Sequence, residues 1–69
     1  MNFYKLIIDC PDEFYFLDLN YTTQEDGETY HWFLCLNSGG KSQIKTRNLR
    51  LLQPIQYSDI DQSQIKETL

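Results

Sequence analysis

Apolar and polar residues alternate along much of this chain, a pattern typical of half-buried β-strands. In segment 3–10 the even positions are apolar or aromatic, and Lys5 and Asp9 lie on the other face. The alternation returns in 14–21, where the odd positions face inward. Segment 29–36 is largely apolar on both faces, which predicts a central strand covered on both sides. We therefore expect the first half of the chain to form three strands.

Turn-forming residues separate these segments. Residues 11–12 are Pro-Asp, which lets the second strand return antiparallel to the first. Segment 22–28 is polar throughout and contains Asp26-Gly27, so we expect an exposed loop there. Gly39 and Gly40 can adopt the positive φ of a hairpin turn, which predicts a hairpin between the third and fourth strands.

The second half of the chain has shorter apolar runs. Segments 43–46 and 49–53 predict two short strands joined near residues 47–48. A helix is expected over about 59–68, because Ser58 can cap it and acidic residues occupy its first turn. A helix of about 11 residues must pack on the sheet to persist. On that view it would cover the second apolar face of strand 14–21, which carries Phe14 and Phe16.

These elements predict one domain, 1–69, of the mainly β class, a β-rich α+β fold. It would have about five strands and a short C-terminal helix. The five short strands, the glycine hairpin and the closing segment 48–54 resemble small SH3-like barrels in architecture. The resemblance implies a small SH3-like barrel, with a strongly curved antiparallel sheet as the alternative. It implies no binding residues.

The inventory of catalytic groups is thin. A chain of 69 residues buries only about 60% of its unfolded surface, which leaves little room for a substrate pocket. His31 is the single histidine, and on one strand it would lie about 13 Å from Cys35, out of contact. The neighbouring carboxylates point apart in an extended chain, and no metal-ligand spacing is present. We therefore expect a protein that is not an enzyme and has no cofactor and no metal.

The cysteines and the apolar runs bear on location. No segment approaches the roughly 20 apolar residues that cross a bilayer, and the first ten residues lack a signal peptide's apolar region. We expect a cytoplasmic protein that makes no membrane contact, in which Cys10 and Cys35 are small buried thiols. If the chain were secreted, a Cys10–Cys35 disulfide between neighbouring strands would be the alternative.

Charge is distributed unevenly along the chain. The net charge is −4, and residues 1–30 hold seven acids and one base. This balance disfavours a protein whose main task is to bind a phosphate backbone. It favours an acidic face that meets a basic protein surface, with aromatic anchors beside it. The acidic candidates are Glu25, Asp26 and Glu28, and the aromatic candidates are Tyr21, Tyr30 and Trp32.

Small size and acidity are typical of inhibitors and adaptors. We expect a protein-binding module of that kind, as phages and mobile elements encode to block host defence enzymes. One alternative is weak nucleic-acid binding through the basic residues Lys41, Lys45, Arg47 and Arg50. The other is a homo-oligomeric structural subunit, built through exposed Phe14 and Phe16 or an unpaired edge strand.

Overall fold

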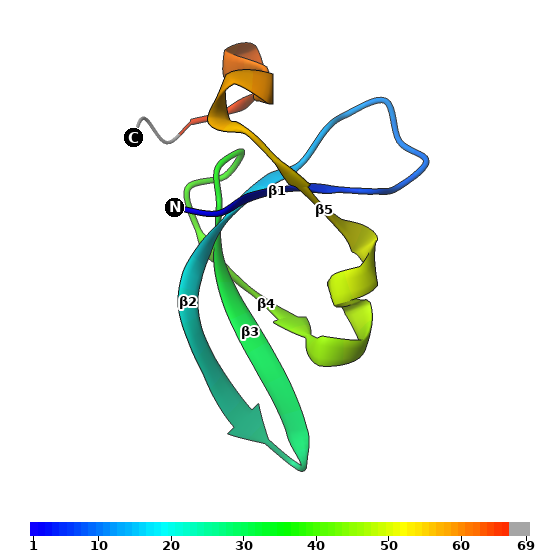
Figure 1. Cartoon of the computed structure of the whole chain (residues 1–69), viewed down its shortest axis with the longest axis vertical. Helices are drawn as coiled ribbons and strands as arrows, with labels where there is room; N and C mark the ends of the chain where they lie inside the picture. Colours follow the sequence, from blue (N-terminus) through cyan, green and yellow to red (C-terminus); the bar gives the residue numbers. More distant parts are fainter. Residues whose placement is uncertain (67–69) are drawn as a thin grey trace.

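The predicted antiparallel sheet is present in the computed structural model, which describes residues 1–66 (Figure 1). It contains five strands in the spatial order β4-β3-β2-β1-β5. Their bounds are β1 Phe3–Leu6, β2 Tyr15–Glu25, β3 Glu28–Cys35, β4 Lys41–Lys45 and β5 Leu52–Ile55. Three 3-10 helices accompany them: η1 Thr46–Leu51, η2 Tyr57–Asp59 and η3 Gln62–Gln64. The fold class expected from the sequence, a β-rich fold with about five strands, is confirmed.

The strand order makes β4 and β5 the two edges of the sheet. β1 pairs antiparallel with both β2 and β5, and β3 lies between β2 and β4. Helix η1 connects the two edge strands, and the sheet curves strongly around the space between them (Figure 1). The pairing is that of a curved antiparallel sheet, the second of the two architectures expected from the sequence. Segment 29–36 is internal to the sheet, as predicted.

The first strand is shorter than its sequence pattern indicates. β1 ends at Leu6, whose amide donates to the carbonyl of Phe14 at 3.0 Å, the last bond of this ladder. The next amide, that of Ile7, donates instead to the carbonyl of Leu51 at 2.7 Å. The chain therefore leaves β2 after Leu6, and Ile8 and Cys10 are exposed rather than buried.

The β2–β3 hairpin is longer than predicted. Segment 22–28 is not a loop, because both strands continue to a two-residue turn at Asp26 and Gly27. These residues have φ values of 51° and 80°, the positive values that a tight hairpin turn requires. Figure 1 shows this hairpin extending away from the end of the molecule that carries η2 and η3.

An irregularity in β2 changes which side chains face inward. The pairing of β2 with β3 shifts register between Asp18 and Thr22. Within this stretch Asn20 has φ 66°, and its amide donates to the Asp18 carboxylate at 2.7 Å. Such a bulge interrupts the strict alternation of a strand. Tyr21, expected to face inward, is consequently 43% exposed.

The sheet buries one apolar cluster on each face. One contains Phe3, Tyr15, Leu17, Leu36 and Ile60, and Ile60 comes from the C-terminal segment. The other contains Phe16, Phe33, Cys35 and Leu52, with Leu49 of η1 among the residues packed against it.

The C-terminal segment covers the face opposite to the one expected. Phe16 is covered by Leu52 and Leu49, and residues 60–65 pack on the other cluster. Phe16 is only 7% exposed and Phe14 is half-buried, so the structure contradicts the exposed Phe16 of the homo-oligomer alternative.

The helix predicted over 59–68 is absent from residues 57–66. Two single 3-10 turns, η2 and η3, replace it, and residues 67–69 lie outside the described residues. The Asp59 carboxylate accepts from the Gln56 amide at 3.0 Å, and the Asp61 carboxylate accepts from the Ser63 amide at 3.1 Å. Such local bonds compete with helix propagation. They also let Ile60 and Ile65, five residues apart, both reach the same apolar cluster.

The join between the last two strands also differs from the prediction. The strand expected at 43–46 corresponds to β4. The strand expected at 49–53 is wrong for residues 49–51, which belong to the six-residue helix η1, and only residues 52–53 lie in β5. The glycine hairpin between β3 and β4 is confirmed, with Gly39 at φ 81° and its amide donating to the Cys35 carbonyl at 2.8 Å. Gly40, also expected to have a positive φ, does not have one.

Candidate protein-binding hairpin

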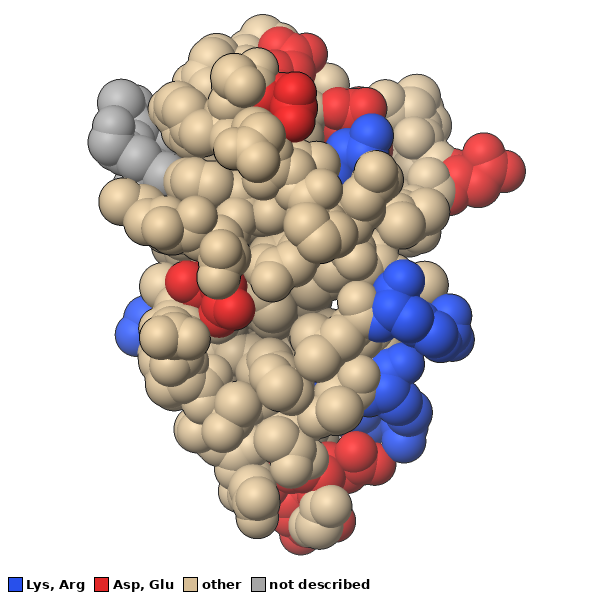
Figure 2. All heavy atoms as spheres, viewed as in Figure 1, with Lys and Arg blue, Asp and Glu red and all other residues tan. Residues whose placement is uncertain are grey.

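The tip of the β2–β3 hairpin gathers the three acidic candidate residues. Glu25 and Glu28 lie directly opposite one another in the ladder, and Asp26 occupies the turn between them. Figure 2 shows their red atoms at the tip of the molecule that this hairpin forms. Like charges directly opposite across two strands destabilise the pair. A cation near the tip therefore relieves repulsion that the fold itself creates.

One of the three acids already has a cationic partner. The guanidinium of Arg47 in η1 donates to the Glu28 carboxylate at 3.0 Å. The pair is exposed, so it contributes little to stability but neutralises part of the tip. Glu25 and Asp26 form no ion pair with any residue of 1–66, so they remain free to meet a cationic partner.

The aromatic candidates lie further along the same hairpin. The rings of Tyr21 and Trp32 stack with centroids 6.1 Å apart and an interplanar angle of 14°. The Trp32 indole N–H donates to the hydroxyl of Thr23 at 2.7 Å, which fixes the ring across the two strands. Tyr30 lies two residues before Trp32 on β3 and is half-buried. The bulge in β2 and the alternation of β3 together place this stack outside both apolar clusters.

We call the face of the sheet that carries Trp32 and Leu34 the outer face. The C-terminal segment covers only one end of it. On β3, Phe33 and Cys35 face the cluster under η1, so Trp32 and Leu34 face the other side. Leu34 packs against the cluster that Ile60 completes. Residues 60–65 thus cover the end of this face near Leu34, and the end toward the hairpin tip stays open.

The structure divides the basic candidates between two places. The ammonium of Lys41 lies 6.0 Å from the Tyr21 ring centroid, and that of Lys45 lies 6.0 Å from the Tyr30 centroid. Lys45 is the ladder partner of Tyr30, so both side chains leave the same face. Arg47 is engaged by Glu28. The aromatic and lysine candidates, considered separately in the sequence, therefore share one face.

Arg50, the fourth basic candidate, lies in the last turn of η1 and is exposed. Figure 2 shows blue atoms gathered along the side of the molecule where η1 lies, next to the acidic tip. Arg47 and Arg50 thus belong to η1, whereas Lys41 and Lys45 lie over the aromatic rings of the hairpin.

The nucleophilic and basic groups are dispersed. The His31 ring nitrogen Nε2 lies 2.9 Å from the hydroxyl of Thr46 and forms a hydrogen bond with it. Cys35 is a buried thiol, as expected, and Cys10 is exposed in the β1–β2 connection. In the described part of the chain, no three His, Cys, Asp or Glu side chains form a group that could hold a metal ion.

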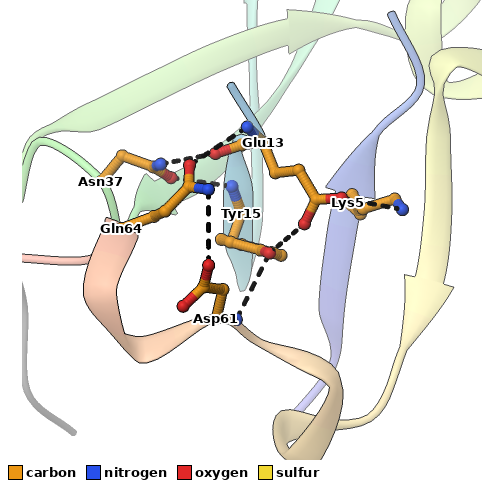
Figure 3. A network of polar contacts seen from close by, with 6 residues as sticks. All are labelled: Lys5, Glu13, Tyr15, Asn37, Asp61 and Gln64. Atoms are coloured by element: carbon orange, nitrogen blue, oxygen red, sulfur yellow. Dashed lines mark hydrogen bonds and ion pairs between the residues drawn. The ribbon is translucent and has the colours of Figure 1, made fainter. Parts of the chain in front are cut away.

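A polar network around Tyr15 was not foreseen from the sequence (Figure 3). The Tyr15 hydroxyl, on a fully buried side chain, donates to the Glu13 carboxylate and accepts from the Asp61 amide at 3.3 Å. The Lys5 ammonium lies 3.5 Å from the same carboxylate. The hydrogen bond from Tyr15 is the main cause that lowers the pKa of Glu13, and Lys5 lowers it further. Burial is the main cause that raises the pKa of Tyr15.

Two amide side chains extend this network across three segments. Asn37 accepts from the Tyr15 amide at 2.8 Å and donates to the Glu13 carbonyl at 2.6 Å. Gln64 accepts from the Glu13 amide at 3.2 Å. The network joins the start of β2, the β3–β4 turn and the C-terminal segment, so its role is to hold that segment on the sheet.

No protein-family model, curated protein or solved structure matches this chain. Among residues 1–66, no helix is long and apolar enough to span a membrane.

Proposed function

We propose that this protein is a small protein-binding module that docks through the outer half of its β2–β3 hairpin. The observation that carries the proposal is the Tyr21–Trp32 stack, which lies outside both apolar clusters on the hairpin whose tip carries Glu25 and Asp26. Tyr and Trp are enriched among the residues that dominate binding energy at protein interfaces. The stack is already formed, so little side-chain entropy is lost when a partner covers it.

The charges of the hairpin indicate the chemistry of the partner. Glu25 and Asp26 have no ion pair in residues 1–66, and Glu25 faces Glu28 across the ladder. A basic surface on the partner would relieve this repulsion and speed association. The aromatic stack would then supply the short-range contacts that hold the complex.

A module of this size would act by occupying a surface rather than by chemistry. By analogy of class, it is a cytoplasmic inhibitor or adaptor that blocks a basic channel of its target. Phages and mobile elements encode small acidic proteins that act in this way against host defence enzymes. The support for this step is the acidic hairpin and the small size of the chain.

The test is charge reversal at the two free acids. Glu25→Lys/Asp26→Lys reverses both charges and keeps both residues of the Glu28–Arg47 pair. Asp9→Lys/Asp12→Lys is the matched control, because it changes the same charge at exposed positions in the β1–β2 connection. Each tagged variant is used to recover partners from a nuclease-treated lysate of the source organism, followed by kinetics with the recovered protein.

We expect the hairpin variant to associate more slowly, most clearly at low salt, and the control variant to bind as the wild type. A variant that keeps wild-type association at low salt would refute docking through the acidic tip.

A second candidate is weak binding of single-stranded nucleic acid on the same outer face. The placement of Lys41 and Lys45 over the Tyr21 and Tyr30 rings favours it, because such surfaces combine stacking with cations. The net charge of −4 opposes it. Titration of the protein with oligothymidylate at two salt concentrations tests this candidate. If the lysines bind phosphates, the affinity must fall steeply as the salt concentration rises.

A further inference from the structure

Strand β4 is the open edge of the sheet. Its five residues pair with β3 on one side, and on the other side no strand among residues 1–66 pairs with them. The opposite edge, β5, is four residues long and contains Pro54, which has no amide donor. Of the two edges, β4 is therefore the one that can accept another strand.

The alternation of hydrogen bonds shows which backbone groups of β4 are free. The Cys35 amide donates to the Gly40 carbonyl at 2.8 Å. Hydrogen-bonded pairs in an antiparallel ladder recur every second residue, so Ser42 and Ile44 direct their backbone groups to β3. The amide and carbonyl groups of Lys41 and Gln43 and the amide of Lys45 consequently point outward. The carbonyl of Lys45, the N-cap of η1, accepts the first hydrogen bond of that helix.

A groove runs beside this edge. It has a volume of about 520 Å³ and lies between β4 and η1. Its apolar and aromatic lining residues are Leu6, Phe16, Tyr30, Ile44 and Leu51, and its polar ones are Ser42, Gln43, Lys45 and Asn48. Strand addition to an edge combines main-chain hydrogen bonds with pockets for alternate side chains. This edge offers both, because four of its five residues, Ser42 to Lys45, line the groove.

We propose that β4 binds an extended acidic segment of a partner protein, added to the sheet as a sixth strand. Side chains of the segment that lie opposite Ser42 and Ile44 enter the groove, so they are apolar. Side chains opposite Lys41 and Lys45 share the outer face with these two lysines, which form no ion pair in residues 1–66. They are therefore acidic, and the segment has the order acidic, apolar, any residue, apolar, acidic.

The same charges disfavour a second copy of this chain as the occupant. Antiparallel pairing of two β4 strands about Gln43 places Lys41 of one copy opposite Lys45 of the other, twice. Like charges directly opposite are destabilising in a ladder, and lysines on an edge strand commonly prevent self-association. An acidic strand turns both repulsions into attractions.

The peptide experiment uses two sequences of the same composition. One ten-residue peptide has Glu-Val-Thr-Val-Glu at its centre, and the matched control has Val-Glu-Thr-Glu-Val, which directs its acids into the groove. Each is titrated into the ¹⁵N-labelled full chain. The first peptide should shift and protect the outward amides of Lys41, Gln43 and Lys45. The control should bind roughly tenfold more weakly, because two cross-strand charge pairs are lost.

Two variants test the same interaction from the protein side. Lys41→Glu/Lys45→Glu should lose the acidic peptide and gain a peptide with Lys-Val-Thr-Val-Lys at its centre. Gln43→Pro removes an outward amide and leaves the bonds to β3 intact, so it should weaken binding, whereas Gln43→Thr should not. Glu25→Lys/Asp26→Lys should bind the acidic peptide as the wild type does, because this inference does not rest on the hairpin function.

Four outcomes would overturn the proposal. The first is equal binding of the two peptides, and the second is peptide-induced shifts confined to Tyr21 and Trp32. The third is a β4-mediated dimer in sedimentation, which would assign the edge to a second copy. In the fourth, the β4 amides shift with oligothymidylate and not with the acidic peptide, which would assign the lysines to nucleic acid.

Discussion

Tyr15 illustrates how a single residue can serve two environments. Its ring lies within the apolar cluster of Phe3 and Leu17, and its hydroxyl reaches the Glu13 carboxylate and the Asp61 amide. A buried hydroxyl without partners would destabilise the fold, so these two bonds are what permit a tyrosine at this position. The partners come from 46 residues further along the chain and from two residues before, which couples the C-terminal segment to β2.

The ionisation of Glu13 predicts a pH dependence of stability. The bond from Tyr15 lowers the pKa of Glu13 below its ordinary 4.5, and the bond from the Ser63 hydroxyl lowers that of Asp61 below 3.8. The folded state thus binds these protons less readily than the unfolded state does. Their stabilising contribution is fully present above about pH 5 and is lost as the pH falls through the folded pKa values.

Urea unfolding followed by Trp32 fluorescence from pH 7 to pH 3 measures this dependence. Glu13→Gln keeps an acceptor for Tyr15 but removes the charge, so the decline of unfolding free energy below pH 5 should become shallower. Asp12→Asn, at the neighbouring exposed position, is the control and should keep the wild-type slope. Identical slopes for wild type and Glu13→Gln would show that this carboxylate does not contribute.

The elements of the sheet differ in how locally they are specified. The β2–β3 hairpin has its turn in two residues, Asp26 and Gly27, both with positive φ. The bulge around Asn20 is also local, because the Asp18 side chain bonds to the Asn20 amide. Together they fix the register that carries Tyr21 outward onto Trp32, so the candidate site depends on turn and bulge geometry.

Substitution of the turn glycine measures that dependence. Gly27→Ala should lower the unfolding free energy by about 1 kcal/mol, because alanine is strained at positive φ. A β-carbon at Gly27 would meet no atom within 4 Å, so the loss reflects backbone conformation alone. Gly40→Ala is the matched control, since a β-carbon there would lie 3.6 Å from the Ser38 hydroxyl in ordinary contact. Equal losses of unfolding free energy for Gly27→Ala and Gly40→Ala would show that the positive φ of Gly27 is not the cause.

At the scale of the whole molecule, one sheet separates two small apolar clusters. The cluster under η1 is covered by Leu52 of β5 and Leu49 of η1. The cluster on the other face is closed by Ile60 and by Ile65, from a segment without regular helix. A chain of this size has little core to spare, so the C-terminal segment is part of the fold rather than an appendage.

Truncation of Ile60 tests that conclusion. Ile60 is 5% exposed, so Ile60→Ala should lower the unfolding free energy by about 2–4 kcal/mol, a large share of a small domain's stability. Ile8→Ala, at a residue that is 44% exposed, should change it by less than about 0.5 kcal/mol. A small effect at Ile60, measured by urea unfolding, would mean that the C-terminal segment does not stabilise the sheet.

The candidate site was only partly foreseeable. The acids and aromatics were identified by residue type, and both groups lie on the β2–β3 hairpin. The sequence could not show that the aromatic residues share one face with Lys41 and Lys45, because this depends on the register between β3 and β4. Similarly, the pairing of Glu28 with Arg47 joins residues 19 apart through the position of η1.

The sequence by itself determined the β-rich class, the approximate strands and the glycine hairpin between β3 and β4, since alternation and turn chemistry act over a few residues. Tertiary structure decided where β1 ends, which face the C-terminal segment covers and how Tyr15 is satisfied. It also replaced the expected helix by two short turns, because Ile60 and Ile65 gain more by both reaching the core than one helical face would allow. Such outcomes depend on contacts between distant residues, which local patterns do not contain.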